Sequence, residues 1–362
     1  MSMTTTAYRP DRSFLLWLSL LVSLMPFALV ASGSKTFEVW DQILDLVGSN
    51  PFELLFAGQA HALRFIIMQP CLLVAGVFRA DIDLVFSWLI AGLIVILARL
   101  VAGIVASVSG RSSSDWIYSF PTVGISLTAI SLFQNGRLIF AFVGCALMVY
   151  GQVRWYMYER RSIGMLLLGG VTALILLSVS SGSFMVGILT WLLFVLRLAV
   201  AAMQGRNAPD RKDLGVLISF AGVAIAFIPV IIIFVTKNLD YFGGGLGAVI
   251  PMLAHGPGAI FLEFMGDSLV TATMALAMIT AVCLIVVSTV VRLRSAVGIV
   301  WLPILASLLV GPFGYSTLIT CMPAVLSLVV FALPSVRFGK RSSQLVIAMI
   351  EARNWMRQCA RV

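Results

Sequence analysis

The chain has 362 residues, of which 60% are hydrophobic and 11% charged, and its mean hydropathy is +1.06. A water-soluble domain of this length could not bury so much apolar surface, so the composition excludes an ordinary soluble globular protein. The formal net charge of +9 does not require a nucleic-acid partner, because lysine and arginine gather on the cytoplasmic side of membrane proteins.

Long apolar runs separated by short charged joints predict an all-α, polytopic transmembrane helical bundle. About 20 helical residues cross the hydrocarbon core of a bilayer. The predicted spans are 13–32, 84–106, 138–153, 163–180, 184–203, 214–236, 269–291 and 295–333, the last long enough to cross twice with a break at 311–314. Although Arg9 and Arg12 precede it, the first run is predicted to be a membrane helix rather than a signal peptide.

Two further segments, 54–78 and 117–133, leave the number of early crossings open. In the rest of the chain basic and weakly charged joints alternate, and the positive-inside bias puts the basic joints and the C-terminus in the cytoplasm. Arg137 is then outside, so an odd number of crossings must precede it if Arg9 and Arg12 are inside. One of the two segments would be re-entrant or interfacial. We therefore expect ten spans, or eleven with an outside N-terminus.

Residues 1–334 are predicted to form one transmembrane domain with an outer loop at 237–268. Residues 335–362 are predicted to form a basic amphipathic cytoplasmic tail, which either lies on anionic inner-leaflet lipids or is solvated. The five cysteines are scattered, without a CxxC pair or a Cys/His cluster, and we expect neither a metal site nor a cofactor. Asp81-Ile82-Asp83 matches the Asp-x-Asp pattern of metal-dependent sugar transferases, but carboxylates at a helix start are common and we favour that interpretation.

The outer loop has the most unusual composition in the chain. Its glycine run, 243–247, allows positive-φ backbone near a ligand or a membrane surface. His255 is one of two histidines, and an imidazole is a ready general base near neutral pH. Glu263 is the second candidate for a base. The alternative is a flexible connector whose histidine is merely exposed, although loops on rigid scaffolds often carry sites.

A late outward loop with Gly-Leu-Gly, then His255, then Leu262-Glu263 before the next span resembles the O-antigen ligase/polymerase family. Phe133-Gln134-Asn135-Gly136-Arg137 resembles the F-x-N-x-N entry of that family into a span, and an outward small-residue turn follows at 180–183. The resemblance covers about residues 115 to 333. The chain departs from the family in having no arginine at that turn and only Lys237 and His255 as basic residues of the outer loop.

The resemblance implies a GT-C-type glycosyltransferase of the bacterial cytoplasmic (inner) membrane. Its substrate would be a glycan linked to undecaprenyl pyrophosphate or a similar lipid carrier. Its activity would be polymerisation of repeat units for an exopolysaccharide, capsule or O-antigen on the outer face, with ligation to another acceptor as a close variant. The implied partners are flippase and chain-length regulator proteins, with no cofactor and no nucleic acid.

Such a transfer needs a base for the acceptor hydroxyl, here His255 or Glu263, and fixed cations for the departing pyrophosphate. Arginine suits this role because its planar fork binds phosphate oxygens bidentately. The pyrophosphate- and glycan-binding candidates are Arg137, Lys237, Arg64, Asn135 and Tyr241, with Arg111 a weaker one. A snorkelling role for Arg137 and an anchoring role for Arg64 remain open.

Arg99 and Arg197 lie inside predicted spans, where a charge costs roughly 3 kcal/mol on insertion scales. Both could reach an interface by snorkelling, so we leave them out of the site. Two other functions remain open: a lipid-linked glycan transporter or flippase, and a non-catalytic membrane subunit of a secretion or assembly system. The near absence of intramembrane acidic residues and of internal repeats disfavours a proton-coupled transporter.

Overall fold

The computed structural model describes residues 12–59, 62–109, 113–157, 162–203, 211–241, 243–251, 266, 268–292 and 296–310. Over these ranges the protein is all-α, which confirms that part of the predicted fold class. The predicted tail at 335–362, and the second crossing expected within 295–333, lie outside the described residues.

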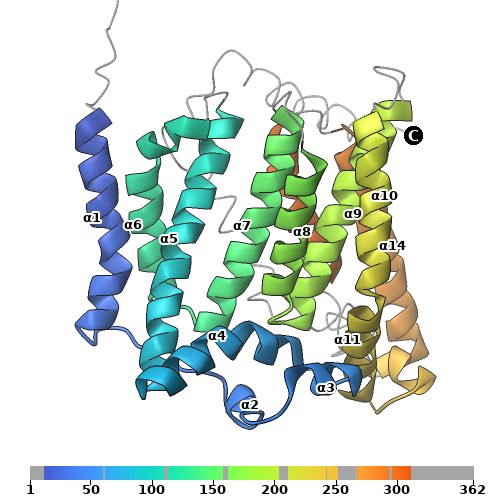
Figure 1. Ribbon diagram of the computed structural model, residues 1–362. Coiled ribbons are helices and arrows are strands. Elements are labelled where there is room, and N and C mark those ends of the chain that lie inside the picture. The colour runs from blue at the N-terminus through green and yellow to red at the C-terminus, as the bar shows by residue number, and fades with distance from the viewer. Residues whose placement is uncertain are drawn as a thin grey trace, which may run out of the picture.

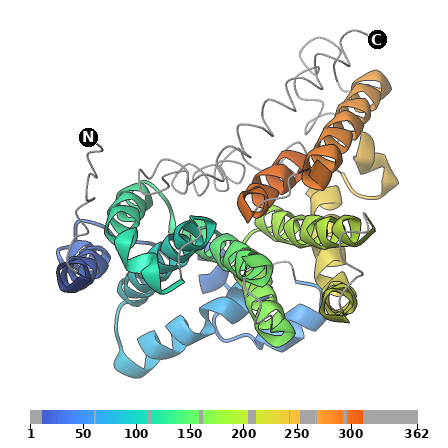
Figure 2. The same cartoon turned by 90° about the horizontal axis from the view of Figure 1, so that it is seen from above.

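Most of the helices stand side by side as a bundle, and Figure 2 looks along their axes. In chain order they are α1 (Arg12–Ala31), α5 (Ile82–Val108), α6 (Phe120–Ser131), α7 (Gly136–Met157), α8 (Ile163–Leu177), α9 (Ser181–Met203), α10 (Arg211–Ala226), α14 (Leu269–Arg292) and α15 (Ala296–Val310). A short 3-10 helix, η1 (Ser113–Tyr118), joins α5 to α6 at one end of the bundle (Figure 1).

Four of these helices in the described ranges, α1, α5, α7 and α9, are long and apolar enough to cross a membrane. The number becomes five if α10 and α11 (Ile228–Tyr241), bent by 50°, form one span. The expected ten or eleven spans are therefore not reached among the described residues. The predicted span 163–180 folds as a shorter helix, α8, of 15 residues, and the uncertain segment 117–133 contains α6, of 12 residues. Since α6 extends only about 18 Å, it is shorter than the hydrocarbon core.

Helix α4 (Ala62–Phe78) does not stand in the bundle but lies across its lower end in Figure 1, with α2 (Asp41–Leu44) and α3 (Pro51–Phe56) beside it. Its buried side chains Phe65, Met68, Cys71 and Ala75 recur every three or four residues, so one face packs against the bundle. Of the two uncertain segments, 54–78 is therefore the one that does not stand upright. Three upright helices, α1, α5 and α6, precede α7, but α6 is one of the shorter apolar helices, so the expected odd number of crossings stays a prediction.

The connection between α1 and α2 is tied to the bundle by side-chain hydrogen bonds. The Phe37 N–H donates to Ser87 Oγ at 2.8 Å, and the Val39 N–H donates to Asp83 Oδ1 at 2.8 Å. Because both acceptors lie in the first two turns of α5, the α2–α4 layer is held over that end of the bundle.

The bend between α10 and α11 falls beside Pro229, whose ring has no N–H to donate and crowds the carbonyl of the preceding turn. Helix α11 then continues to Tyr241, so the first five residues of the predicted outer loop are helical. The helix ends where the Gly243 N–H donates to the Asp240 carbonyl and the Gly244 N–H to the Leu239 carbonyl. This is a Schellman motif, and the φ of +104° at Gly243 requires glycine there. The positive-φ backbone expected in the glycine run is confirmed.

Candidate functional site

Three of the predicted phosphate-binding cations come together, although they are far apart in the sequence. The positive charges of Arg64 and Arg137 act on Lys237, and the charge of Arg137 acts on Arg64. They belong to α4, to the first turn of α7 and to the last turns of α11. The fold therefore builds a cationic cluster, defined as Arg64, Arg137 and Lys237, at the end of the bundle where α4 lies (Figure 1).

Arg64 is the most buried of the three, with 5% of its surface exposed. Its Nη1 donates to Gln42 Oε1 at 3.1 Å, a contact that joins α4 to α2. Burial, and then the charge of Arg137, lowers the pKa of Arg64 to about 10. The guanidinium is still charged at neutral pH, and its environment favours a neighbouring anion.

Arg137 is fixed by the start of α7. Asn135 Oδ1 accepts the Leu138 N–H at 3.0 Å and so caps this helix. Gly136 lies against the Phe86 ring of α5, where an added Cβ would come within 2.6 Å of two ring carbons. Phe86 stacks on Phe140, and the Trp40 ring packs against both. The aromatic cluster thus fixes the α5–α7 contact beneath Arg137, while Asn135 has a capping role.

Lys237 is half-buried near the end of α11, and Tyr241, 83% exposed, closes the same helix. The Schellman motif that follows Tyr241 stops the helix and leaves Lys237 within range of the two arginines. The predicted base candidates His255 and Glu263, and the weaker cation Arg111, lie outside the described residues.

The two aspartates of the Asp-x-Asp pair accept hydrogen bonds from the backbone and so have a structural role. Asp81 Oδ1 accepts the Asp83 N–H at 2.9 Å as the N-cap of α5, and Asp83 Oδ1 accepts the Val39 N–H. Both carboxylates therefore have backbone partners, in agreement with the helix-start interpretation.

The two arginines within candidate spans lie beside tyrosines of α7. Arg197 is 6% exposed, and its Cζ lies 5.0 Å from the centre of the Tyr156 ring, so it packs between α9 and α7 rather than extending into lipid. Arg99 lies over the Trp116 ring of η1 at 4.2 Å and is hydrogen-bonded to Tyr150.

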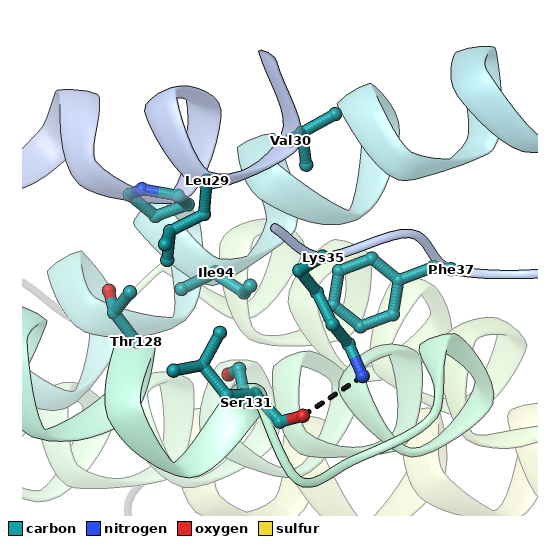
Figure 3. Close-up of a pocket in the computed structure, with 9 residues that line it drawn as sticks. Leu29, Val30, Lys35, Phe37, Ile94, Thr128 and Ser131 are labelled. Carbon is teal, nitrogen blue, oxygen red and sulfur yellow. Dashed lines mark hydrogen bonds between the residues drawn. The ribbon is translucent and has the colours of Figure 1, made fainter. Parts of the chain in front are cut away.

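A small pocket between α1, α5 and α6 does not extend the site. It is lined by Leu29, Val30, Phe37, Ile94 and other mainly apolar side chains, and the Lys35 ammonium donates to the Leu132 carbonyl at 2.9 Å across its edge (Figure 3). Its volume of about 10 Å³ has room for one water at most. The lysine therefore stabilises the end of α6, and the pocket cannot hold a glycan or a lipid headgroup.

Sequence reasoning missed Gln42 and Trp40. Gln42 orients Arg64, and Trp40 belongs to the aromatic cluster beneath Arg137. Neither lies in a predicted span or a recognisable motif. The signal that could have found them is the Trp-Asp-Gln sequence between two apolar segments, a composition typical of a short interfacial helix.

Comparison with protein-family models, with curated proteins and with solved structures gives no match to this chain. The class of protein is therefore defined by the fold and composition: an all-α protein with several candidate membrane spans, as in multi-pass membrane proteins.

Proposed function

We propose that this protein transfers glycan units from a lipid pyrophosphate carrier on the outer face of a bacterial cytoplasmic membrane, as a repeat-unit polymerase does. The observation that carries the proposal is the convergence of Arg64, Arg137 and Lys237 from three separate elements. Clustered cations that are partly or fully buried favour an anion of two or more charges, such as a pyrophosphate.

The charge distribution supports an outward-facing site. The cationic cluster lies at the end of the bundle that holds α4. Arg154, close to the end of α7, and Arg211, which begins α10, belong to joints at the opposite end (Figure 1). The positive-inside bias assigns those joints to the cytoplasm, and so assigns the cationic cluster to the outer face.

In the proposed reaction the acceptor hydroxyl gives its proton to a base and attacks the anomeric carbon. The glycosidic bond forms as the bond from that carbon to the pyrophosphate oxygen breaks. The lipid pyrophosphate leaves with the electron pair, and the cationic cluster stabilises its added negative charge. His255 is the proposed base and Glu263 the second choice.

The proposal is tested in a strain that lacks the protein and is complemented with variants, with glycan chain length measured on gels. Arg64→Gln and Arg137→Gln should each lower the yield of long glycan at least about tenfold, since a charge-assisted hydrogen bond contributes about 1.5–3 kcal/mol. His255→Ala should abolish it, and short lipid-linked units should accumulate. Unchanged glycan length in both His255→Ala and Arg137→Ala would refute the site assignment.

Arg79→Gln is the matched control, because Arg79 is exposed beyond the other end of α4, about 22 Å along the helix from Arg64. It removes one charge from the same face and should leave glycan length unchanged. The side of the membrane on which the short lipid-linked units accumulate distinguishes a transferase from a flippase. If the protein is a transferase, an inactive variant leaves these units on the outer face, where an added glycosidase can cleave them. If it is a flippase, an inactive variant leaves them on the inner face, protected from the glycosidase. Protection would contradict the proposal.

A further inference from the structure

A second basic cluster lies at the end of the bundle opposite the proposed transfer site. It consists of Arg99 on α5 and Arg154 on α7, with Tyr150 of α7 between them. Arg154 Nη1 donates to the Tyr150 hydroxyl at 3.5 Å, and Arg99 is hydrogen-bonded to the same tyrosine. We call these three residues the Arg–Tyr–Arg cluster.

The cluster is built by close packing rather than by chance on a mobile surface. An added Cβ on Gly103, one turn after Arg99, would lie 2.7 Å from Tyr150 Cε2 and 3.2 Å from Arg99 Nη1. Only glycine leaves room for both side chains at that point. The Trp116 ring covers one face of the Arg99 guanidinium, with 4.2 Å between Cζ and the ring centre. Stacking uses the face of a guanidinium and leaves its edge N–H groups for an acceptor.

The charges are not balanced at Arg99. The positive charge of Arg154 acts on Arg99, and in the described part of the chain no ion pair joins Arg99 to a carboxylate. Arg99 lies about two and a half turns before the end of α5, inside a candidate span, where a charge is costly. The charge of Arg99 at this depth, with a second arginine beside the same hydroxyl, favours a neighbouring anion.

The hydrogen-bond donors of the Arg–Tyr–Arg cluster match the oxygen acceptors of a phosphodiester. The guanidinium of Arg99 offers paired N–H donors to phosphate oxygens, and the Tyr150 hydroxyl, which accepts from Arg154, has its own proton to donate. Arg154 is exposed, and Arg99, Tyr150 and Trp116 are half-buried, so a ligand can approach from the side of the bundle. Basic sites between membrane helices on the cytoplasmic side bind anionic headgroups, and tryptophan is enriched at that depth.

We infer that the Arg–Tyr–Arg cluster binds the headgroup phosphate of an anionic inner-leaflet phospholipid between α5, η1 and α7. This lipid site is separate from the cationic cluster and does not depend on the transferase proposal. The bound lipid would stabilise the α5–α7 contact on which the position of Arg137 also depends.

The test uses the purified full chain in detergent, with phosphatidylglycerol and phosphatidylcholine added in equal amounts and retained lipid counted by native mass spectrometry. The wild-type protein should retain phosphatidylglycerol in preference to phosphatidylcholine. Arg99→Gln should lower its retention about tenfold, the effect of losing a charge-assisted hydrogen bond. Tyr150→Phe, which keeps the ring and removes the hydroxyl, should lower it several-fold. Arg12→Gln, an exposed arginine at the start of α1 at the same end of the bundle, is the matched control and should change nothing.

Equal phosphatidylglycerol retention by wild type and Arg99→Gln would overturn the inference. So would a rise in melting temperature with millimolar inorganic phosphate as large as the rise with phosphatidylglycerol, since the site would then bind a free anion. If Arg99→Gln fails to fold, Tyr150→Phe decides: it should melt like the lipid-free wild type and lose the rise that phosphatidylglycerol produces. A full rise in Tyr150→Phe would also refute the lipid site.

Discussion

Arg64 is the buried cation of the proposed site. The pKa of its guanidinium is lowered to about 10 by burial and by the charge of Arg137. Because the pKa of Arg64 is higher in the unfolded chain, the unfolded chain holds more protons at pH values between the two pKa values. Stability therefore rises with pH only within that window, and below about pH 9 Arg64 is charged in both states and adds no pH dependence.

Repulsion within the cationic cluster leads to a prediction about stability. Arg137→Gln should stabilise the protein without ligand by up to about 1 kcal/mol, because it removes a like charge beside a buried arginine. Substitution of a residue whose only role is packing would instead lower the stability of the protein. Thermal unfolding in detergent measures the effect, and a fall in the melting temperature would contradict the binding role.

The aspartates of the Asp-x-Asp pair give a second prediction. Asp81→Ser should keep the stability of the protein, because serine also caps a helix, whereas Asp81→Ala should cost about 1 kcal/mol. Denaturant unfolding measures both. A metal role predicts instead that Asp81→Ser abolishes glycan synthesis even though the protein stays folded, and that result would reject the capping interpretation.

The side chains of the cationic cluster could be predicted from sequence, but their meeting could not. Residue type and the expected outward side identified Arg64, Arg137 and Lys237. Their convergence depends on the path of α4 across the bundle, on the cap of α7 at Asn135 and on the extension of α11, and none of these follows from local sequence.

Helices α7, α8 and α9 pack closely together at glycines. An added Cβ on Gly144 of α7 would lie 2.8 Å from the Ala173 carbonyl oxygen of α8, and one on Gly170 would lie 2.6 Å from the Trp191 ring of α9. Small residues at such contacts let membrane helices approach closely.

Two neighbouring glycines of α8 make a matched test of this packing. Gly170→Ala should destabilise the protein by about 1–3 kcal/mol, because Trp191 is fully buried and has no space to move. Gly169→Ala should be neutral or slightly stabilising, since nothing lies within 4 Å of its added Cβ and alanine favours a helix. Unfolding in a denaturing detergent compares the two, and equal effects would contradict the contact.

The positions of α4 and α6 show why span prediction was incomplete. Segments 54–78 and 117–133 are both apolar with one proline, so hydropathy does not separate them. The structure separates them by long-range contacts: Arg64 of α4 pairs with Gln42, and Ser119, just before α6, donates to the Ala102 carbonyl of α5. Such pairings join residues that hydropathy treats independently.

The arrangement of the bundle gives a prediction about topology. Ser13 lies at the start of α1, and Ser49 lies between α2 and α3, at opposite ends of the bundle. In intact cells a membrane-impermeant thiol reagent should label Ser49→Cys and not Ser13→Cys, with the wild type as background. The reverse pattern would place the cationic cluster in the cytoplasm and end the proposal of outer-face transfer.

Binding of a polyprenyl pyrophosphate to the purified protein examines the cationic cluster without relying on cells or on the residues around His255. The wild type should bind the pyrophosphate more tightly than the corresponding prenyl alcohol. Arg64→Gln and Arg137→Gln should each weaken the pyrophosphate about tenfold or more, and Arg79→Gln should leave it unchanged. Equal affinity in all four proteins would show that the three converging cations do not hold the diphosphate.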